Sequence, residues 1–313
     1  MQIIIRMPNW LGDAVMATPL LAIAKKRWPE AEITVVTRPH LAPLYFGNPH
    51  IHRTESTFPK AMDIGILTTN SFSSAWELFK SGAEMRIGFA NECRSFLLTN
   101  PLPFPDERDN EHLVTTYKRL LDAQSDDTSP QLFVTPDEKT EALERFKKLH
   151  VTGPVIGINP TAAYGPAKCW LPERFRAVAK KLARDATVIF FGDEAGKKEV
   201  DEICRGMEVI NLSGQTSLRQ LIALIDACDL FLTNDSGPMH LAAAVQTPLI
   251  ALFGSTNEVA TGPYQWGKVI HKHVACSPCY RQVCPIDFPC MKQITVDEVL
   301  KEIAHHWELC QSS

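Results

Sequence analysis

The sequence predicts an α/β protein built from two Rossmann-like domains. Short runs of β-branched and aliphatic residues alternate with amphipathic stretches, and this alternation restarts near residue 154. Continuous apolar strands of this kind are typical of parallel sheets that helices cover on both faces. The chain has 313 residues, about twice the length of a common single domain, so two domains are expected.

The first half begins as a β-α-β unit. Its expected elements are strands at 2–6, 32–37 and 62–67, a helix that ends near 25–27 and a helix at 73–80. In the last of these, Trp76 and Phe79 recur with other apolar residues at helical spacing. The start of the first helix stays open: Asp13 follows a glycine in the turn after the strand, whereas Thr18 and Pro19 resemble an N-cap and a first-turn proline.

A polar connection separates the two halves. Residues 122–136 are poor in core-forming side chains and contain Pro and Ser, as expected of a surface segment. The helix expected at 137–149 carries Leu143, Phe146 and Leu149 on one face. We place the domain boundary after this helix. The resulting segments are an N-terminal domain at 1–152, a C-terminal domain at 153–295 and a terminal segment at 296–313.

The second half repeats the alternation of strands and helices. Its expected strands lie at 154–158, 186–191, 209–210, 230–232 and 249–253. The terminal segment contains an amphipathic helix at 296–307, for which a return to the N-terminal domain is one option.

Composition and charge exclude several classes of protein. The formal net charge is -4 and the chain has no long Lys/Arg block, so no nucleic-acid partner is expected. The opening residues include only three consecutive isoleucines, too few for a secretion signal, and no apolar stretch approaches the roughly 18 residues of a membrane span. We therefore expect a cytoplasmic protein.

Polar residues follow expected strands in both halves, where ligands of parallel sheets bind. Asp13 lies after the first strand and near the positive end of a helix, which favours its ionised form as a proton acceptor; a capping aspartate is the alternative. In the second half, Lys168 lies in the long loop after the strand at 154–158, together with Thr161. It is placed to bind a diphosphate as a point charge, with a solvated loop lysine as the alternative.

The strongest single sequence signal for a ligand site lies directly after the strand at 230–232, where Asp235, Ser236 and Gly237 lead into a helix. The unpaired amides and dipole of a helix start suit phosphate oxygens. Asp235 is suited to accept hydrogen bonds from sugar hydroxyls. His240, one turn into the helix, either faces the phosphates or is a core histidine.

Several common signatures are missing from the sequence. Neither half contains G-x-G-x-x-G or G-x-x-x-x-G-K-[ST], and there is no G-x-S-x-G elbow. Hydride-transfer dinucleotide enzymes, P-loop phosphotransferases and α/β-hydrolases therefore lose their main support. The functional features that remain are the carboxylate of Asp13 in the first half and an expected anion-binding site in the second half.

On three motifs, the sequence resembles the ADP-heptose:lipopolysaccharide heptosyltransferases, which form glycosyltransferase family 9. The motifs are PNWLGDAVM at 8–16, YGPAKCW at 164–170 and DSGPMH at 235–240. The resemblance spans almost the whole chain. It implies the glycosyltransferase B fold, with the active site in the cleft between an acceptor-binding N-terminal domain and a donor-binding C-terminal domain.

The resemblance also implies an inverting transfer of L-glycero-D-manno-heptose from ADP-heptose, with no required cofactor. Asp13 is the implied general base, and Lys168 is the group that stabilises the departing ADP. The implied donor-binding residues are Thr161, Glu194, Asp235, Ser236, Gly237 and His240, and the implied acceptor-binding residues are Asn70, Ser71 and Arg86.

Residues 70–72 and the cysteine-rich C-terminal stretch favour the heptosyltransferase II type, which acts on the first heptose of the lipopolysaccharide inner core. The alternatives are heptosyltransferase I, which acts on Kdo2-lipid A, and a non-catalytic ADP-sugar-binding protein. Because such acceptors are lipid-linked, we expect peripheral contact with the cytoplasmic face of the inner membrane. Lys80, Arg86 and Arg94 are the cations considered for this contact.

Four cysteines lie close together in the sequence: Cys276, Cys279, Cys284 and Cys290. The group is compact enough to hold one structural zinc or an iron-sulfur cluster, although its second pair is spaced more widely than in a zinc knuckle. Reduced thiols or adventitious disulfides are the alternative. A metal-dependent redox protein built around these cysteines is a third functional class.

Overall fold

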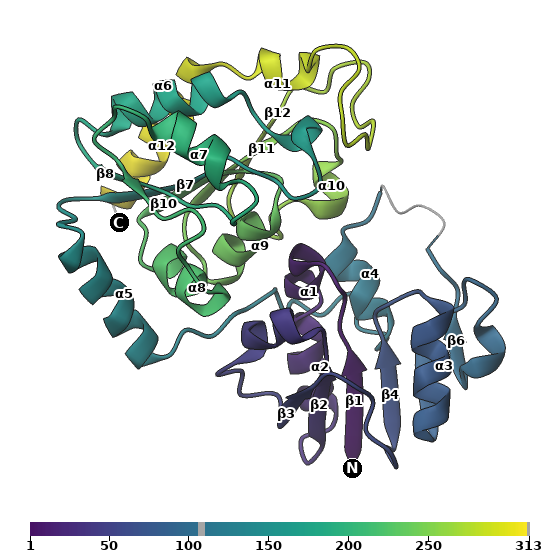
Figure 1. Cartoon of the computed structure of the whole chain (residues 1–313). Coiled ribbons are helices and arrows are strands. Elements are labelled where there is room, and N and C mark those ends of the chain that lie inside the picture. Colours follow the sequence, from purple (N-terminus) through teal and green to yellow (C-terminus); the bar gives the residue numbers. More distant parts are fainter. Residues whose placement is uncertain (106–109, 312–313) are drawn as a thin grey trace. The chain divides into compact units, whose positions relative to one another are not determined.

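The structure, a computed structural model, describes residues 1–105 and 110–311, with side chains up to His306 in the last helix. The chain divides into a first unit, Met1–Phe133, and a second unit, Val134–Ser313. Each unit contains a six-stranded sheet in which every strand pair is parallel (Figure 1). The predicted architecture of two Rossmann-like α/β domains is therefore confirmed.

The first sheet has the order β3-β2-β1-β4-β5-β6. Its strands are β1 (Gln2–Arg6), β2 (Glu32–Val36), β3 (Arg53–Glu55), β4 (Ile64–Leu67), β5 (Met85–Phe89) and β6 (Asn100–Leu102). Its helices are α1 (Leu11–Met16), α2 (Pro19–Arg27), α3 (Phe72–Ser81) and α4 (Leu113–Arg119), with 3-10 turns η1 (Pro39–Tyr45) and η2 (Ser95–Leu97). Ile3, Ile4 and Ile5 are fully buried, because helices cover both faces of β1.

Both sequence signals for the start of the first helix are correct, because two short helices form in succession. Asp13 lies in the first turn of α1, and Pro19 begins α2 after Thr18. The chain bends between the two helices, where the Thr18 hydroxyl donates to the carbonyl of Val15 at 2.8 Å. Asp13 is thereby held on a short, separate helix directly after β1.

The second sheet has the order β12-β11-β10-β7-β8-β9. Its strands are β7 (Val155–Asn159), β8 (Thr187–Phe190), β9 (Ile210–Asn211), β10 (Leu230–Asn234), β11 (Leu249–Phe253) and β12 (Lys268–His271). Its helices are α5 (Pro136–Lys148), α6 (Pro172–Leu182), α7 (Lys197–Cys204), α8 (Leu218–Asp226), α9 (Gly237–Ala244), α10 (Glu258–Thr261), α11 (Pro289–Gln293) and α12 (Val296–Gln311), with the 3-10 turn η3 (Pro166–Lys168). The core around β7, β8 and β10 includes the fully buried Trp170 and Phe175.

The division between the units differs from the predicted boundary after residue 152. Helix α5 belongs to the second unit, where the Glu138 carboxylate pairs with the Arg219 guanidinium and Lys139 pairs with Asp226, both on α8. The amphipathic pattern of α5 was partly right about its buried face, because Phe146 is buried whereas Leu143 is 61% exposed. It could not indicate which domain covers that face, because the partner is set by tertiary packing.

Helix α12 also belongs to the second unit, whereas a return to the N-terminal domain was one option for the terminal segment. It packs against α6, and Lys181 and Asp297 approach to 3.1 Å. Within the described ranges, no helix is both long enough and apolar enough to cross a membrane.

Candidate functional site

Each sheet has one point where the strand order reverses, between β1 and β4 in the first and between β7 and β10 in the second. Ligands of open parallel sheets bind beyond the carboxyl ends of such strands. Asp13 follows β1, and Asn70 and Ser71 follow β4. Lys168 follows β7, and Asp235 to Gly237 follow β10. These predicted residues therefore lie at the two reversal points, whereas Arg86 lies in β5 and Glu194 follows β8.

Asp13 lies near the phenol of Tyr117 on α4. Burial raises the pKa of Tyr117 well above its ordinary value, and the negative charge of Asp13 adds to this effect. Tyr117 therefore stays protonated at neutral pH. Asp13 itself is half-buried.

A basic pocket of about 680 Å³ opens at the carboxyl end of the first sheet. Its charged lining residues are Arg6, Arg38, Lys60, Lys80 and Glu77, and its remaining polar lining consists of Asn9 and of Ser and Thr side chains that include Ser71. The Oδ1 atom of Asn9 accepts from Arg6 at 2.7 Å and from Arg38 at 3.2 Å. Burial and the adjacent Arg38 lower the pKa of Arg6. The pocket is suited to an anionic ligand with hydroxyl groups.

Of the three predicted acceptor residues, Ser71 lines this pocket, whereas Asn70 and Arg86 are not among its lining residues. Ser71 also caps α3, where its hydroxyl accepts from the amide of Ser74. The guanidinium of Arg86 donates to the carbonyls of Leu97 and Ala83.

The prediction of Arg94 as a surface cation is wrong. Its side chain is fully buried, and it donates to the carbonyls of Phe89, Thr69 and Ser71. Phe89 ends β5, and Thr69 and Ser71 lie in the loop between β4 and α3. A buried arginine satisfies their carbonyls.

In the second unit, Lys168 and Asp235 form a buried ion pair. The Lys168 Nζ atom lies 2.6 Å from Oδ2 of Asp235, whose side chain is 4% exposed. The hydroxyl of Thr256, after β11, donates to the same carboxylate oxygen at 2.6 Å. One carboxylate therefore joins the loops that follow β7, β10 and β11.

Two asparagines fix the backbone around this pair. Asn234 accepts from the amide of Trp170 at 2.9 Å and donates to the carbonyl of Pro160 at 2.6 Å. Asn159 donates to the carbonyl of Thr161 at 2.8 Å and to the hydroxyl of Ser236 at 3.2 Å. The loop that carries Lys168 is thus tied to the start of α9.

The loop of Lys168 is also held by the cysteine-rich segment, residues 276–290. Lys168 lies over the ring of Tyr164, whose hydroxyl donates to the carbonyl of Tyr280 at 2.6 Å. The amide of Ala167 donates to the carbonyl of Gln282 at 3.0 Å. Gly165 has φ +149°, and a Cβ there would lie 2.6 Å from that carbonyl oxygen. Glycine is therefore required at this crossing.

The other predicted donor residues lie on the same edge of the sheet. Thr161 packs against Gly196, where a Cβ would lie 2.8 Å from the threonine methyl, and Glu194 packs against Gly214. Ser236 is the residue before α9, and Gly237 begins the helix. His240 is buried within α9. This position agrees with both predicted alternatives, a core histidine and a contact to phosphate.

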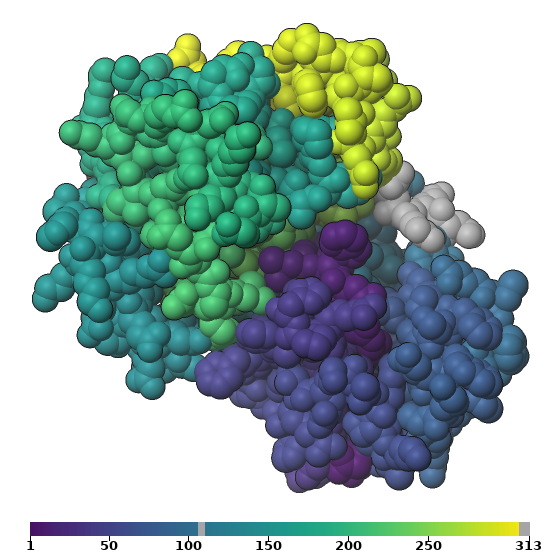
Figure 2. All heavy atoms as spheres, in the orientation of Figure 1, coloured from purple at the N-terminus to yellow at the C-terminus, as the bar shows by residue number. Residues whose placement is uncertain are grey.

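The four cysteines are free thiols. Burial raises the pKa of Cys290, and the neighbouring Cys276 and Cys284 add to this effect. The amide of Phe288 lies 3.2 Å from the sulfur of Cys284. Figure 2 shows that the last part of the chain, in yellow, lies at the surface of the second unit.

Several site residues were not identified from the sequence. Arg6 and Arg38 follow the pattern of ordinary strand-end residues, and Thr256 has no motif around it. The His-x-His pair, His271 and His273, is a sequence signal for a metal site that was not among the predictions. Tyr164 was recognised only as part of a motif and not as a support for Lys168.

The model of glycosyltransferase family 9 (heptosyltransferase) matches residues 56–288. The chain belongs to this family. It is 29% identical to lipooligosaccharide heptosyltransferase 2 of Campylobacter jejuni over 96% of this chain and 97% of the relative. It is 30% identical to lipopolysaccharide heptosyltransferase 2 of Escherichia coli K12 over 84% and 85%, respectively.

Solved structures agree with this assignment. The structure of E. coli ADP-heptose lps heptosyltransferase II matches with a TM-score of 0.85 and 27% identity over the whole of both chains. A family 9 glycosyltransferase from Veillonella parvula matches with a TM-score of 0.86 and 23% identity, over 97% of this chain and 96% of that one. The resemblance, the glycosyltransferase B fold and the enzyme class expected from the sequence are confirmed, and this family 9 chain is a glycosyltransferase.

We predict that Asp235→Asn lowers the free energy of unfolding by about 3 kcal/mol, because the substitution leaves the charge of Lys168 largely buried without its partner. Urea denaturation at pH 7 measures this change. Adding Lys168→Met should recover most of the loss, since no buried charge then remains. Asp297→Asn, in the exposed pair with Lys181, should cost less than about 1 kcal/mol. Equal losses at the two positions would contradict the prediction.

Proposed function

We propose that this chain transfers L-glycero-D-manno-heptose from ADP-heptose to the first heptose of the lipopolysaccharide inner core, the reaction of heptosyltransferase II. The observation that carries the proposal is the Lys168–Asp235 pair beside the start of α9, at the reversal point of the second sheet. Relatives named heptosyltransferase 2, at 29% to 31% identity, support this type of acceptor over that of the relatives named heptosyltransferase 3, at 26% to 27% identity.

Asp13 is proposed as the general base that removes the proton from the acceptor hydroxyl. Attack at an anomeric carbon builds positive charge on the sugar and negative charge on the departing diphosphate. The ammonium of Lys168 is proposed to stabilise that negative charge, together with amides at the start of α9. Pro238 contributes no amide there, so Ser236 and Gly237 are the backbone donors to consider.

The proposed roles of Lys168 and Asp235 are linked by their ion pair. In the absence of donor, Asp235 balances the charge of Lys168. A bound diphosphate would offer Lys168 a second anionic partner, which leaves Asp235 available to heptose hydroxyls. Thr161, Glu194 and His240 remain proposed donor contacts on the same edge.

The basic pocket of the first unit is the proposed acceptor site. The acceptor implied by the family is an anionic oligosaccharide, and the pocket offers four cationic side chains against one acidic one. Its serine and threonine hydroxyls suit the sugar hydroxyl groups. Ser71 is kept as an acceptor residue in this proposal, with Asn70 in a supporting role beside Arg94.

The main test offers ADP-heptose to the purified protein with Kdo2-lipid A that either carries or lacks the first heptose, and measures ADP release. We expect release only with the heptosylated acceptor, and a fall in kcat of at least about 100-fold in Asp13→Asn, because the proton acceptor is lost. Asp137→Asn is the matched control, since Asp137 is an exposed aspartate in the first turn of α5.

Each other outcome of this test has a defined meaning. Turnover only on the unheptosylated acceptor would indicate heptosyltransferase I. Donor binding without turnover on either acceptor would indicate an ADP-sugar-binding protein. Near-normal turnover by Asp13→Asn would remove Asp13 as the base.

For the acceptor pocket, we predict that Arg38→Gln raises the KM for the acceptor by about tenfold, because one charged hydrogen bond to the acceptor is lost. Steady-state kinetics should show an unchanged KM for ADP-heptose. Arg53→Gln is the control, since exposed Arg53 pairs with Glu55 and does not line the pocket. An equal rise in both KM values would argue against an acceptor role.

We also propose that one face of α3 meets the membrane that carries the acceptor. Phe72, Trp76 and Phe79 recur along this helix and are each more than 40% exposed. Phe96, which is 73% exposed, lies against Phe72. Lys80 lies over the ring of Trp76. Exposed aromatic rings next to a cation are typical of peripheral contact with an anionic lipid surface.

We predict that the double variant Trp76→Ser/Phe79→Ser lowers binding to vesicles of phosphatidylethanolamine and phosphatidylglycerol by at least about tenfold, since two rings lose their apolar contact. Vesicle sedimentation measures the bound fraction. Leu143→Ser, which changes an exposed apolar residue on α5, should leave binding unchanged. Equal binding by all three proteins would contradict the proposed face.

A further inference from the structure

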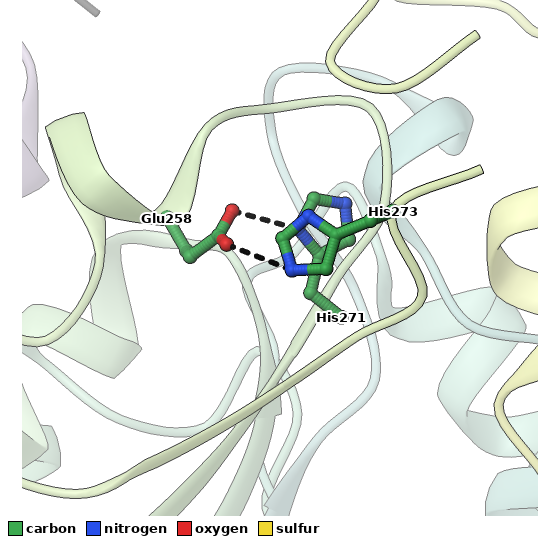
Figure 3. A group of neighbouring side chains, drawn as sticks. All are labelled: Glu258, His271 and His273. Carbon is green, nitrogen blue, oxygen red and sulfur yellow. Dashed lines mark hydrogen bonds and ion pairs between the residues drawn. The ribbon is translucent and has the colours of Figure 1, made fainter. Parts of the chain in front are cut away.

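We propose that Glu258, His271 and His273 form a binding site for a divalent first-row transition metal, with zinc as the expected ion. One ligand atom from each residue lies within 4.8 Å of the others, and Figure 3 shows the carboxylate facing both imidazole rings. This site shares no residue with the proposed transfer chemistry, so the inference stands apart from the proposed function.

The local structure brings these side chains together. His271 is the last residue of β12, and His273 follows two positions later. The chain leaves the strand there, since His273 has a left-handed backbone with φ +44°, and the centres of the two imidazole rings lie 4.2 Å apart. Glu258 is the first residue of α10. Asn257 caps this helix, because the Asn257 side chain accepts a hydrogen bond from the amide of Val259.

The distances suit a small metal ion. One carboxylate oxygen of Glu258 lies 2.6 Å from Nδ1 of His271, and the other lies 3.3 Å from Nε2 of His273. Two ligand atoms of a tetrahedral zinc are roughly 3.3 Å apart, given zinc–nitrogen and zinc–oxygen bonds of about 2.0–2.1 Å. Binding therefore needs only a small withdrawal of the Glu258 carboxylate from His271.

The buried histidine is oriented by a second set of contacts. The Nε2 atom of His271 lies 2.7 Å from the hydroxyl of Ser277, which itself donates to the carbonyl of Gly254. Because that hydroxyl proton is used toward Gly254, Ser277 accepts from Nε2, and Nε2 carries a hydrogen. Metal-binding histidines usually donate their other ring N–H in this way, which presents the opposite nitrogen to the metal. Here that nitrogen is Nδ1, which lies 2.6 Å from the Glu258 carboxylate. Metal binding at Nδ1 releases to solvent the hydrogen that it shares with this carboxylate.

The ligand types select the class of ion. Two imidazoles and one carboxylate favour zinc and similar transition metals over calcium and magnesium, which prefer oxygen ligands. The side chain of His271 is 2% exposed, whereas that of His273 is 69% exposed. The site is therefore anchored on its buried side and open to water on the other, which leaves room for a solvent molecule as the fourth ligand.

The test is a calorimetric titration of the metal-free, full-length protein with zinc at pH 7, followed by X-ray absorption of the loaded protein. We expect zinc in a nitrogen and oxygen shell at about 2.0–2.1 Å. The affinity should fall by at least about tenfold in His273→Ala and in Glu258→Gln. His305→Ala, which removes an exposed histidine on α12, should leave it unchanged. Zinc should raise the Tm of the wild type more than that of His273→Ala.

The same experiment separates this site from the four cysteines. Zinc held by thiolates gives a sulfur shell at about 2.3 Å, and its binding would not respond to His273→Ala or Glu258→Gln. Absence of zinc binding, an exclusively sulfur shell, or equal affinity in the wild type and both variants would each overturn the proposal.

Discussion

The ion pair between Lys168 and Asp235 is the interaction on which the candidate site of the second unit depends. Both side chains are largely buried, and separating them would leave a charge in a poorly solvated place, at a cost of several kcal/mol. Thr256 shares the same carboxylate oxygen. The pair therefore fixes the relative positions of three strand-end loops. In the proposed function, the diphosphate has to compete with Asp235 for Lys168, which is a basis for selecting a strongly anionic ligand over a neutral sugar.

The position of this pair follows from the order of the strands. Strands β7 and β10 are neighbours although their connections run to opposite sides of the sheet, so the loops that follow them diverge and leave room above their shared edge. Asn159 ends β7 and Asn234 ends β10. Their side chains donate to and accept from the diverging loops, which replaces the hydrogen bonds that the sheet no longer supplies there. In the first sheet, Asp13 follows β1 at the corresponding reversal point.

The sequence was sufficient to predict the features of the fold and the site that depend on local sequence patterns. Buried strands such as Ile3 to Ile5 had to be apolar throughout, and the motif around Asp235 had to combine small residues with a helix start. The side to which α5 packs was not predictable, because its ion pairs with α8 connect residues far apart in the chain. For the same reason, the burial of Arg94 and the convergence of Arg6 and Arg38 on Asn9 were missed: each depends on carbonyls or amides that only the folded sheet brings together.

The irregular stretch between β12 and α11 has to be held in place by individual contacts, since it forms neither helix nor strand. Ordering each such residue costs about 1–2 kcal/mol of backbone entropy. The amides of Cys279 and Tyr280 both donate to the carbonyl of Ser255, and Ser277 is tied to Gly254. The loop that carries Lys168 donates hydrogen bonds to the carbonyls of Tyr280 and Gln282 in this stretch. A metal at His271 and Glu258 would fix the base of the stretch, and the ordering would extend from there toward Lys168. The regular sheet thus places Lys168 and Asp235 at its carboxyl edge, and hydrogen bonds to an irregular segment hold the Lys168 loop in position.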